Sequence, residues 1–291
     1  MRKFRFTPKK AAKLKKGQTV EGNTLRPNRA LQEKYVRSWI QKIDAMAKDV
    51  SADVIKLFDT KEAKRNYAMD ASFASMAERL SERSTKKWLK IFDAFADRWA
   101  DSMVDDFNKQ SGVSVSATLT KLAGGLTIKA SSISQKTSEM MTASSAEAAS
   151  LIKTISSEYL SDVSEQVMRA VKDPAAGGFE KLQRDIQSKL NDKYKRVKNH
   201  SKNVALDQTR KTFQSLNYSR LRDAGVDEFI WIHSGGAKFP RKDHIAMNGN
   251  KYSFNDLPVI DKKTGERGIP GQAYFCRCMM KPVITFGDDD D

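Results

Sequence analysis

The chain of 291 residues has few cysteines and no long apolar run. Only one residue separates its two cysteines, Cys276 and Cys278, so a disulfide between them would close a very small, strained ring. The pair excludes a disulfide framework and indicates either reduced thiols of a protein made in the cytosol or metal ligands. No apolar stretch approaches the roughly 18–20 residues needed to cross a membrane. The basic start of the chain lacks the apolar region of a secretory signal.

Acidic residues are scarce relative to basic ones, with 36 Asp and Glu against 52 Lys and Arg and a formal net charge of +16. So much positive charge repels itself unless an anionic partner is near, most often nucleic acid and next an acidic protein surface. In residues 1–30, ten basic side chains face a single acid, Glu21. We interpret 1–30 as a basic arm that is either a solvated tail or docks on DNA phosphates or an acidic partner. Its candidate contact residues are Arg2, Lys3, Arg5, Lys9, Lys10, Lys13, Lys15 and Lys16.

A second basic segment spans 191–222, where nine Lys and Arg outnumber Asp192 and Asp207. A solvated helix face and a phosphate-facing patch explain this composition equally well. Any DNA binding is expected to be non-specific, because phosphates would carry the affinity and no base-reading motif is evident. The candidate contact residues of the patch are Lys195, Arg196, Lys198, Arg210 and Lys211.

Apolar residues at three- and four-residue steps predict amphipathic helices from about Asn28 onward. One stripe covers 36–50 and a second covers 88–107, with a third helix predicted between them at 67–80. We expect the aromatic residues of these stripes to form a core between helices. The Ser111-Gly112 pair is expected to end the second stripe, and 113–129 to form a short strand pair or an extended connection.

Helix is expected to resume before Ala146 and to end at Pro174. A short amphipathic helix at 179–190 and a further helix at about 197–224 follow. Gly225 marks the end of the helical region and the start of a segment with a different composition.

Beyond Gly225 the sequence predicts short strands joined by turns. A buried strand is expected at 229–232, a hairpin turn at 248–250, a loop at 258–271 and a last strand at 274–284. The predicted fold is mainly α, with an elongated helical N-terminal region followed by a small α+β module. The predicted segments are the basic arm 1–30, a helical domain 31–130, long helices with the basic patch 131–225, the module 226–286 and an acidic tail 287–291.

Two of the three histidines and both cysteines lie in this module, whereas His200 is expected at the surface of the basic helix. In a strand, Cys276 and Cys278 would point to the same side. Together with His233 and His244 they can form a tetrahedral zinc site that staples a module too small to hold itself by its core alone. Paired cysteines of a zinc knuckle usually have a wider spacing. The alternative is that the thiols pack as small hydrophobes and the imidazoles bond to backbone.

A nuclease or other hydrolase is the alternative function. Asp243 and His244 would supply a base, Arg241 and Lys242 would hold a phosphate, or a Cys–His pair would supply a nucleophile. The sequence has no Gly-rich phosphate loop, no His-Glu-x-x-His and no Gly-x-Ser-x-Gly. We therefore expect a protein that is not an enzyme and requires no cofactor, with structural zinc as the one candidate.

Four motifs occur in order in the last third of the chain: an Asp-Gln-Thr helix, a Trp-containing strand, an Arg-x-x-His element leading to a glycine, and Cys-Arg-Cys. Their residues are Asp207, Gln208, Thr209, Trp231, Arg241, His244, Gly249, Cys276, Arg277 and Cys278. This pattern resembles the MuF-like domain, the phage Mu F-like head-morphogenesis family of tailed bacteriophages. The resemblance covers about 197–283 and is weaker upstream. His233 is not part of the family pattern.

The resemblance implies a minor capsid protein that is made in the host cytoplasm and lies inside the phage capsid near the portal vertex. It implies a structural role in head assembly, genome packaging or genome delivery. The implied partners are the portal protein, packaged double-stranded DNA and other head proteins. No enzymatic activity is established for the module, although some relatives carry a toxin enzyme after it. Because this chain ends at Asp291, we expect no such enzyme in it.

Overall fold

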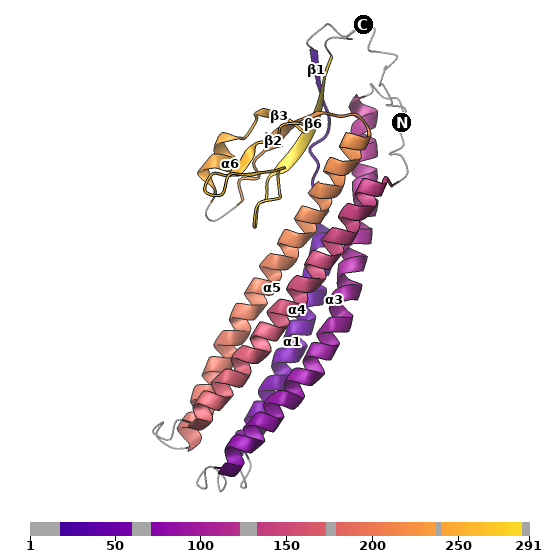
Figure 1. Cartoon of the computed structure of the whole chain (residues 1–291). Coiled ribbons are helices and arrows are strands. Elements are labelled where there is room, and N and C mark those ends of the chain that lie inside the picture. Colours follow the sequence, from indigo (N-terminus) through magenta and orange to yellow (C-terminus); the bar gives the residue numbers. More distant parts are fainter. Residues whose placement is uncertain (1–17, 60–70, 123–132, 173–178, 237–239, 287–291) are drawn as a thin grey trace. The chain divides into compact units, whose positions relative to one another are not determined.

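A computed structural model describes residues 18–59, 71–122, 133–172, 179–236 and 240–286 (Figure 1). Most of them lie in long helices, and a small region of short strands follows the last long helix, so the fold is mainly α with an α+β module, as the sequence predicts. The predicted arm residues from Arg2 to Lys16 and the acidic tail at 287–291 lie outside the described residues. The helices are α1 (Arg29–Asp59), α3 (Ala71–Leu122), α4 (Gln135–Lys172), α5 (Phe179–Asp223) and the short α6 (Lys242–Ala246).

The predicted helix end at Ser111-Gly112 is wrong, because both residues lie inside α3. Residues 113–122, expected to be extended, are helical too, whereas 123–129 lie outside the described residues. A glycine inside a helix costs only about 1 kcal/mol relative to alanine. The buried side chains of Val115 and Leu119 continue the apolar stripe past it, and their packing outweighs that cost.

Two further predicted helix boundaries are absent. The predicted helices at 179–190 and 197–224 are one helix, α5, and the part of the predicted 67–80 helix that is described forms the start of α3. The end near Gly225 is confirmed: α5 stops at Asp223, and Gly225 has a positive φ of 78°. None of the described helices is both long and apolar enough to cross a membrane.

The chain folds into two compact units, each assembled from several segments. The first comprises the described parts of 1–32, 101–145 and 206–291, and the second those of 33–100 and 146–205. Every long helix therefore contributes to both units, a division that differs from the successive segments 31–130 and 131–225 predicted above.

The second unit is a four-helix bundle in which each helix makes polar contacts with the next one around the bundle. Such contacts between neighbouring helices are typical of an up-down-up-down arrangement. The linking pairs are Asp53–Ser84 between α1 and α3, Asp97–Lys153 between α3 and α4, Asp162–Lys193 between α4 and α5, and Asp44–Lys198 between α1 and α5.

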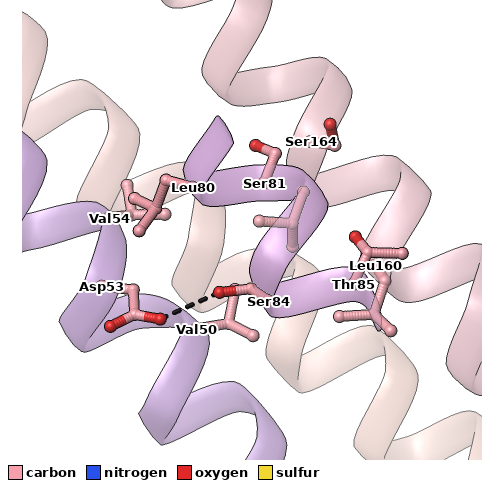
Figure 2. A pocket seen from close by; sticks show the side chains of 10 residues that line it. Val50, Asp53, Val54, Leu80, Ser81, Ser84, Thr85, Leu160 and Ser164 are labelled. Atoms are coloured by element: carbon pink, nitrogen blue, oxygen red, sulfur yellow. Dashed lines mark hydrogen bonds between the residues drawn. The ribbon is translucent and has the colours of Figure 1, made fainter. Parts of the chain in front are cut away.

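Aromatic side chains fill the middle of this bundle, as the stripes predict. Trp39 of α1 and Trp99 of α3 are buried and meet edge to face, with ring centroids 5.5 Å apart. Figure 2 shows a small pocket among α1, α3 and α4, where Ser84 donates a hydrogen bond of 2.9 Å to Asp53. The only carboxylate in the pocket is already bonded, so the pocket is not a candidate functional site.

The first unit contains a four-stranded antiparallel sheet in the order β1-β6-β2-β3. The inner strand β6 pairs with β1, which belongs to the predicted basic arm, on one side and with β2 on the other. The strand β2 confirms the predicted strand at 229–232. A separate hairpin pairs β4 with β5. The strands are β1 (Gln18–Glu21), β2 (Glu228–Ile232), β3 (Lys251–Ser253), β4 (Val259–Asp261), β5 (Glu266–Arg267) and β6 (Met279–Phe286).

Four details of the predicted strands and loops are wrong. Residues 18–21, which belong to the predicted basic arm, form a strand. The segment 258–271, which was predicted to be a loop, contains the β4–β5 hairpin. The hairpin predicted around 248–250 requires a strand just before the turn, but those residues form α6 and its C-cap. The strand β3 therefore pairs with β2, which lies further back along the chain. The last strand is displaced toward the C-terminus, from 274–284 to 279–286.

Candidate metal centre

His244 is positioned by the short helix α6. Its ring is 2% exposed and lies edge-on to the buried indole of Trp231, with centroids 5.2 Å apart. The Nε2 atom lies 3.0 Å from the carbonyl oxygen of Ile260. Because a carbonyl only accepts, Nε2 carries a proton and donates it, and Nδ1 is the ring atom left to bind a metal. The Ile260 carbonyl could not be found from sequence, since nothing about its side chain marks it.

Cys276 and Cys278 lie in the turn before β6 rather than in the predicted strand. The residue before them, Phe275, has a positive φ of 56°, which is incompatible with a strand. The two thiols were predicted to point to the same side because side chains alternate along a strand. That reason is wrong, since the thiols do not lie in a strand. The turn still directs both buried sulfur atoms at the imidazole of His244.

His244, Cys276 and Cys278 form a group that can hold a metal ion, with their ligand atoms all within 4.8 Å of one another. Nδ1 of His244 lies 3.4 Å from Sγ of Cys276 and 3.6 Å from Sγ of Cys278. In tetrahedral zinc sites, bonds of about 2.3 Å to sulfur and about 2.0–2.1 Å to nitrogen place such donors about 3.5 Å apart. Both nitrogen–sulfur distances therefore match those of a tetrahedral zinc site.

His233, the fourth predicted ligand, lies beside this group but not in it. Its Nδ1 is 3.5 Å from Sγ of Cys278, yet the compact group of ligand atoms does not include it. Its backbone N–H donates to the side chain of Asn248 at 2.8 Å, which fixes the backbone but leaves the imidazole half-exposed. The structure thus brings three of the four predicted ligands together.

Hydrogen bonds in the group set the protonation of the thiols. A hydrogen bond from the Cys278 thiol, together with His244 and against the effect of burial, lowers the pKa of Cys276 to about 4. The same hydrogen bond and burial raise the pKa of Cys278. Hydrogen bonding to Cys276 raises the pKa of His244. The lowered pKa favours the thiolate form of Cys276, the form in which cysteine binds metals.

Asp207, from the Asp-Gln-Thr motif, lies against the thiol-bearing turn. The carboxylate is 1% exposed, and Oδ1 accepts the backbone N–H of Phe275 at 2.7 Å. Oδ2 forms an ion pair of 3.0 Å with Lys211. Burial raises the pKa of Asp207, while Lys211 and the Phe275 N–H oppose that shift. The sequence marked Asp207 as a motif residue but gave no sign that it contacts a turn 68 residues away.

Other motif residues hold neighbouring backbone in place. The Arg241 guanidinium donates to the carbonyl of Tyr274 at 2.8 Å, and that of Arg277 donates to the carbonyl of Gly236. The backbone N–H of Gly249, at a φ of 83°, donates to the carbonyl of Trp231 at 2.8 Å.

The remaining two motif residues are buried on α5. Thr209 Oγ1 accepts a hydrogen bond of 3.0 Å from Gln32, and Gln208 is its neighbour in the same motif. All the motif residues therefore lie in the first unit.

The predicted basic patch separates into outward and inward residues. Lys195 and Arg196 are exposed, whereas Lys198 bonds to Asp44 and to Tyr194. Lys211 is paired with Asp207, and burial lowers the pKa of the Arg210 guanidinium. Arg210 and Lys211 are half-buried, and Lys211 already pairs with a carboxylate, so their contact with a phosphate stays a prediction. His200, expected at the surface, is exposed.

The groups suggested for hydrolysis have other partners. Asp243 forms an ion pair of 2.6 Å with Lys262, and Arg241 is bonded to the Tyr274 carbonyl. His244 and Cys276 are 2% and 3% exposed, and Cys278, which also lies against His233, is buried as well. A nucleophile must reach its substrate, so this burial suits a structural centre better than a catalytic one.

Comparison with known proteins adds one distant relative. A Haemophilus influenzae protein described as uncharacterized is 27% identical over 134 residues, a match that covers 46% of this chain and 27% of the relative. The chain therefore matches only about a quarter of that relative's length. No protein-family model and no solved structure match the chain.

Proposed function

We propose that the chain is a minor capsid protein of the MuF-like head-morphogenesis family, a structural component of a tailed-phage virion. The supporting observation is the convergence of the motif residues. Asp207, Trp231, Arg241, His244 and the two thiols are spread over 72 positions of the sequence (207–278) yet surround one buried group in the first unit. A pattern that resembles a family by sequence alone need not converge in space, whereas a pattern that defines a folded module must.

The second part of the proposal is that the centre is a structural zinc site held by His244, Cys276 and Cys278, with His233 as the candidate fourth ligand. A bound zinc would cross-link α6, the turn before β6 and the segment after β2. The strands other than β6 have five residues or fewer. So small a sheet buries too little apolar surface to stabilise this region without a further cross-link. Burial of the three ligands and the hydrogen bond that fixes the His244 imidazole both favour a structural role over catalysis.

The third part concerns partners. We propose that the module docks the chain on the portal protein or a neighbouring head protein, and that basic surface faces packaged double-stranded DNA without sequence preference. Exposed Lys195 and Arg196 on α5, with the basic arm, are the candidate phosphate contacts. The role would be exercised inside the capsid near the portal vertex, in head assembly and in genome packaging or delivery.

Co-expression tests this function. The full chain is produced with the portal protein of the same phage genome, and a tag on the portal is used for capture. The chain is expected to co-purify, and Cys276→Ser is expected to reduce the recovered amount, whereas exposed Asp192→Ala on α5 is not. Failure of the intact chain to bind portal or any other head protein of that genome would contradict the proposal.

A further inference from the structure

We propose that Asp207 is a positioning residue for the metal centre, which acts through the backbone of Phe275 to hold the Cys276–Cys278 turn in its ligand-binding form. The inference rests on the proposed zinc centre and adds to it a residue on a different element, α5. The carboxylate of Asp207 bonds to the Phe275 N–H and to Lys211 and not to a ligand side chain, so its effect on the metal must pass through the turn.

The contacts of the carboxylate are specific to this turn. Its Oδ1 accepts the Phe275 N–H at 2.7 Å, and its Oδ2 pairs with Lys211 at 3.0 Å. A hydrogen bond to an ionised acceptor is stronger than one between neutral groups, and its 2.7 Å length is typical of that class. The ion pair with Lys211 orients the carboxylate, because Lys211 lies one helical turn further along α5.

Phe275 needs such a partner because of its backbone conformation. With a φ of 56°, it is the one non-glycine residue of positive φ in the described part of the chain. A positive φ is energetically unfavourable for L-amino acids that carry a Cβ atom, and it persists only where surrounding contacts enforce it. The next residue is Cys276, whose N–H closes a turn onto the carbonyl of Ala273 at 2.8 Å.

The conformation of Phe275 therefore sets the direction in which Cys276 leaves the turn. If Phe275 relaxed to a negative φ, the two thiols would no longer converge on Nδ1 of His244. Asp207 prevents this relaxation by giving the Phe275 N–H a buried, charged acceptor. Groups that orient ligands from outside the ligand set typically change metal affinity by about 10- to 100-fold when removed.

The test measures zinc affinity of the full chain by competition with a chromophoric chelator, and uses the Co²⁺ absorption spectrum to report thiolate coordination. Asp207→Ala is expected to weaken zinc binding by about 10- to 100-fold. Adding Phe275→Gly to Asp207→Ala is expected to recover most of the loss, because glycine adopts a positive φ readily. Asp192→Ala, a change of an exposed aspartate on the same helix, is expected to leave affinity unaltered.

Recovery by Phe275→Gly separates positioning from a merely structural contribution of Asp207 to α5. If Asp207→Ala binds zinc as tightly as the intact chain, or if the loss is not recovered by Phe275→Gly, the inference is overturned while the zinc centre stands. If the intact chain binds no zinc, both the centre and the inference fail. Should Asp207→Ala unfold by circular dichroism, Asp207→Leu, which has a similar size but no acceptor for the Phe275 N–H, decides in the same way: a loss reversed by Phe275→Gly supports the inference, and unchanged affinity overturns it.

Discussion

Each ring nitrogen of His244 has a different partner. Nε2 is bonded to the Ile260 carbonyl, and Nδ1 faces the sulfur atoms of Cys276 and Cys278. We predict that purified protein contains one equivalent of zinc and that His244→Ala abolishes it, because the two thiolates and His233 leave the metal one ligand short of a tetrahedral set. Elemental analysis of the metal-to-protein ratio makes the measurement. His200→Ala, a change of an exposed histidine on α5, should retain the full equivalent, and zinc retained by His244→Ala would refute the assignment.

Residue types in the sequence were enough to select the ligands but not their surroundings. His244 and the closely spaced thiols stood out because, with His233, they are the only histidines and cysteines in 226–286. The same reasoning included His233, which lies beside Cys278 but outside the compact group. The role of Asp207 depends on the backbone angle of Phe275, and no residue type encodes a positive φ except glycine.

At the scale of elements, β1 joins the start of the chain to its last strand, and Gly22 allows this packing. A Cβ atom at Gly22 would lie 2.6 Å from Cγ2 of Thr118 on α3 and 3.1 Å from the carbonyl oxygen of Pro282. The Gly22 N–H also donates to that carbonyl at 2.8 Å, so the backbone has little room to withdraw.

We predict that Gly22→Ala lowers the free energy of unfolding by roughly 1–3 kcal/mol, the usual cost of overpacking. Chemical denaturation of the full chain measures it. The matched variant is Gly112→Ala inside α3, where the nearest atoms to an added Cβ are 3.9 Å away. It should raise the free energy of unfolding by roughly 0.5–1 kcal/mol, because alanine favours the helix. Equal effects of the two substitutions would argue against the close packing of β1 on α3.

Helices could be predicted from the sequence where an apolar repeat extends over many residues. The ends of those helices could not be predicted. The aromatic stripes predicted helices correctly because Trp39, Trp99 and Phe107 recur at helical steps and are buried. The prediction that Ser111-Gly112 ends the helix was wrong because it relied on the low helix propensity of these two residues. It left out Val115 and Leu119, which continue the apolar stripe beyond them. The strand β1 was missed because four residues in a basic segment carry almost no pattern, and only pairing with β6 makes them a strand.

At the scale of the whole molecule, the excess of basic residues predicts a salt-sensitive interaction with DNA. Each phosphate contact contributes about 0.9 to the slope of log affinity against log salt concentration. Replacing both Lys195 and Arg196 by alanine should therefore reduce that slope by about 1.8, measured by fluorescence anisotropy on a labelled duplex. Arg79→Ala with Lys90→Ala removes the same charge from exposed positions on α3 and should change the slope less. Equal reductions would reveal a response to net charge rather than a binding face.

The most direct test of the account is the amount of the chain in purified phage particles. Particles induced from the strain that carries the gene are banded on a density gradient, and peptides of this chain and of the portal protein are quantified by mass spectrometry. The chain is expected to band with intact particles in a few copies per portal ring. Recovery of the chain only from the soluble lysate, with none in particles that contain portal, would contradict it.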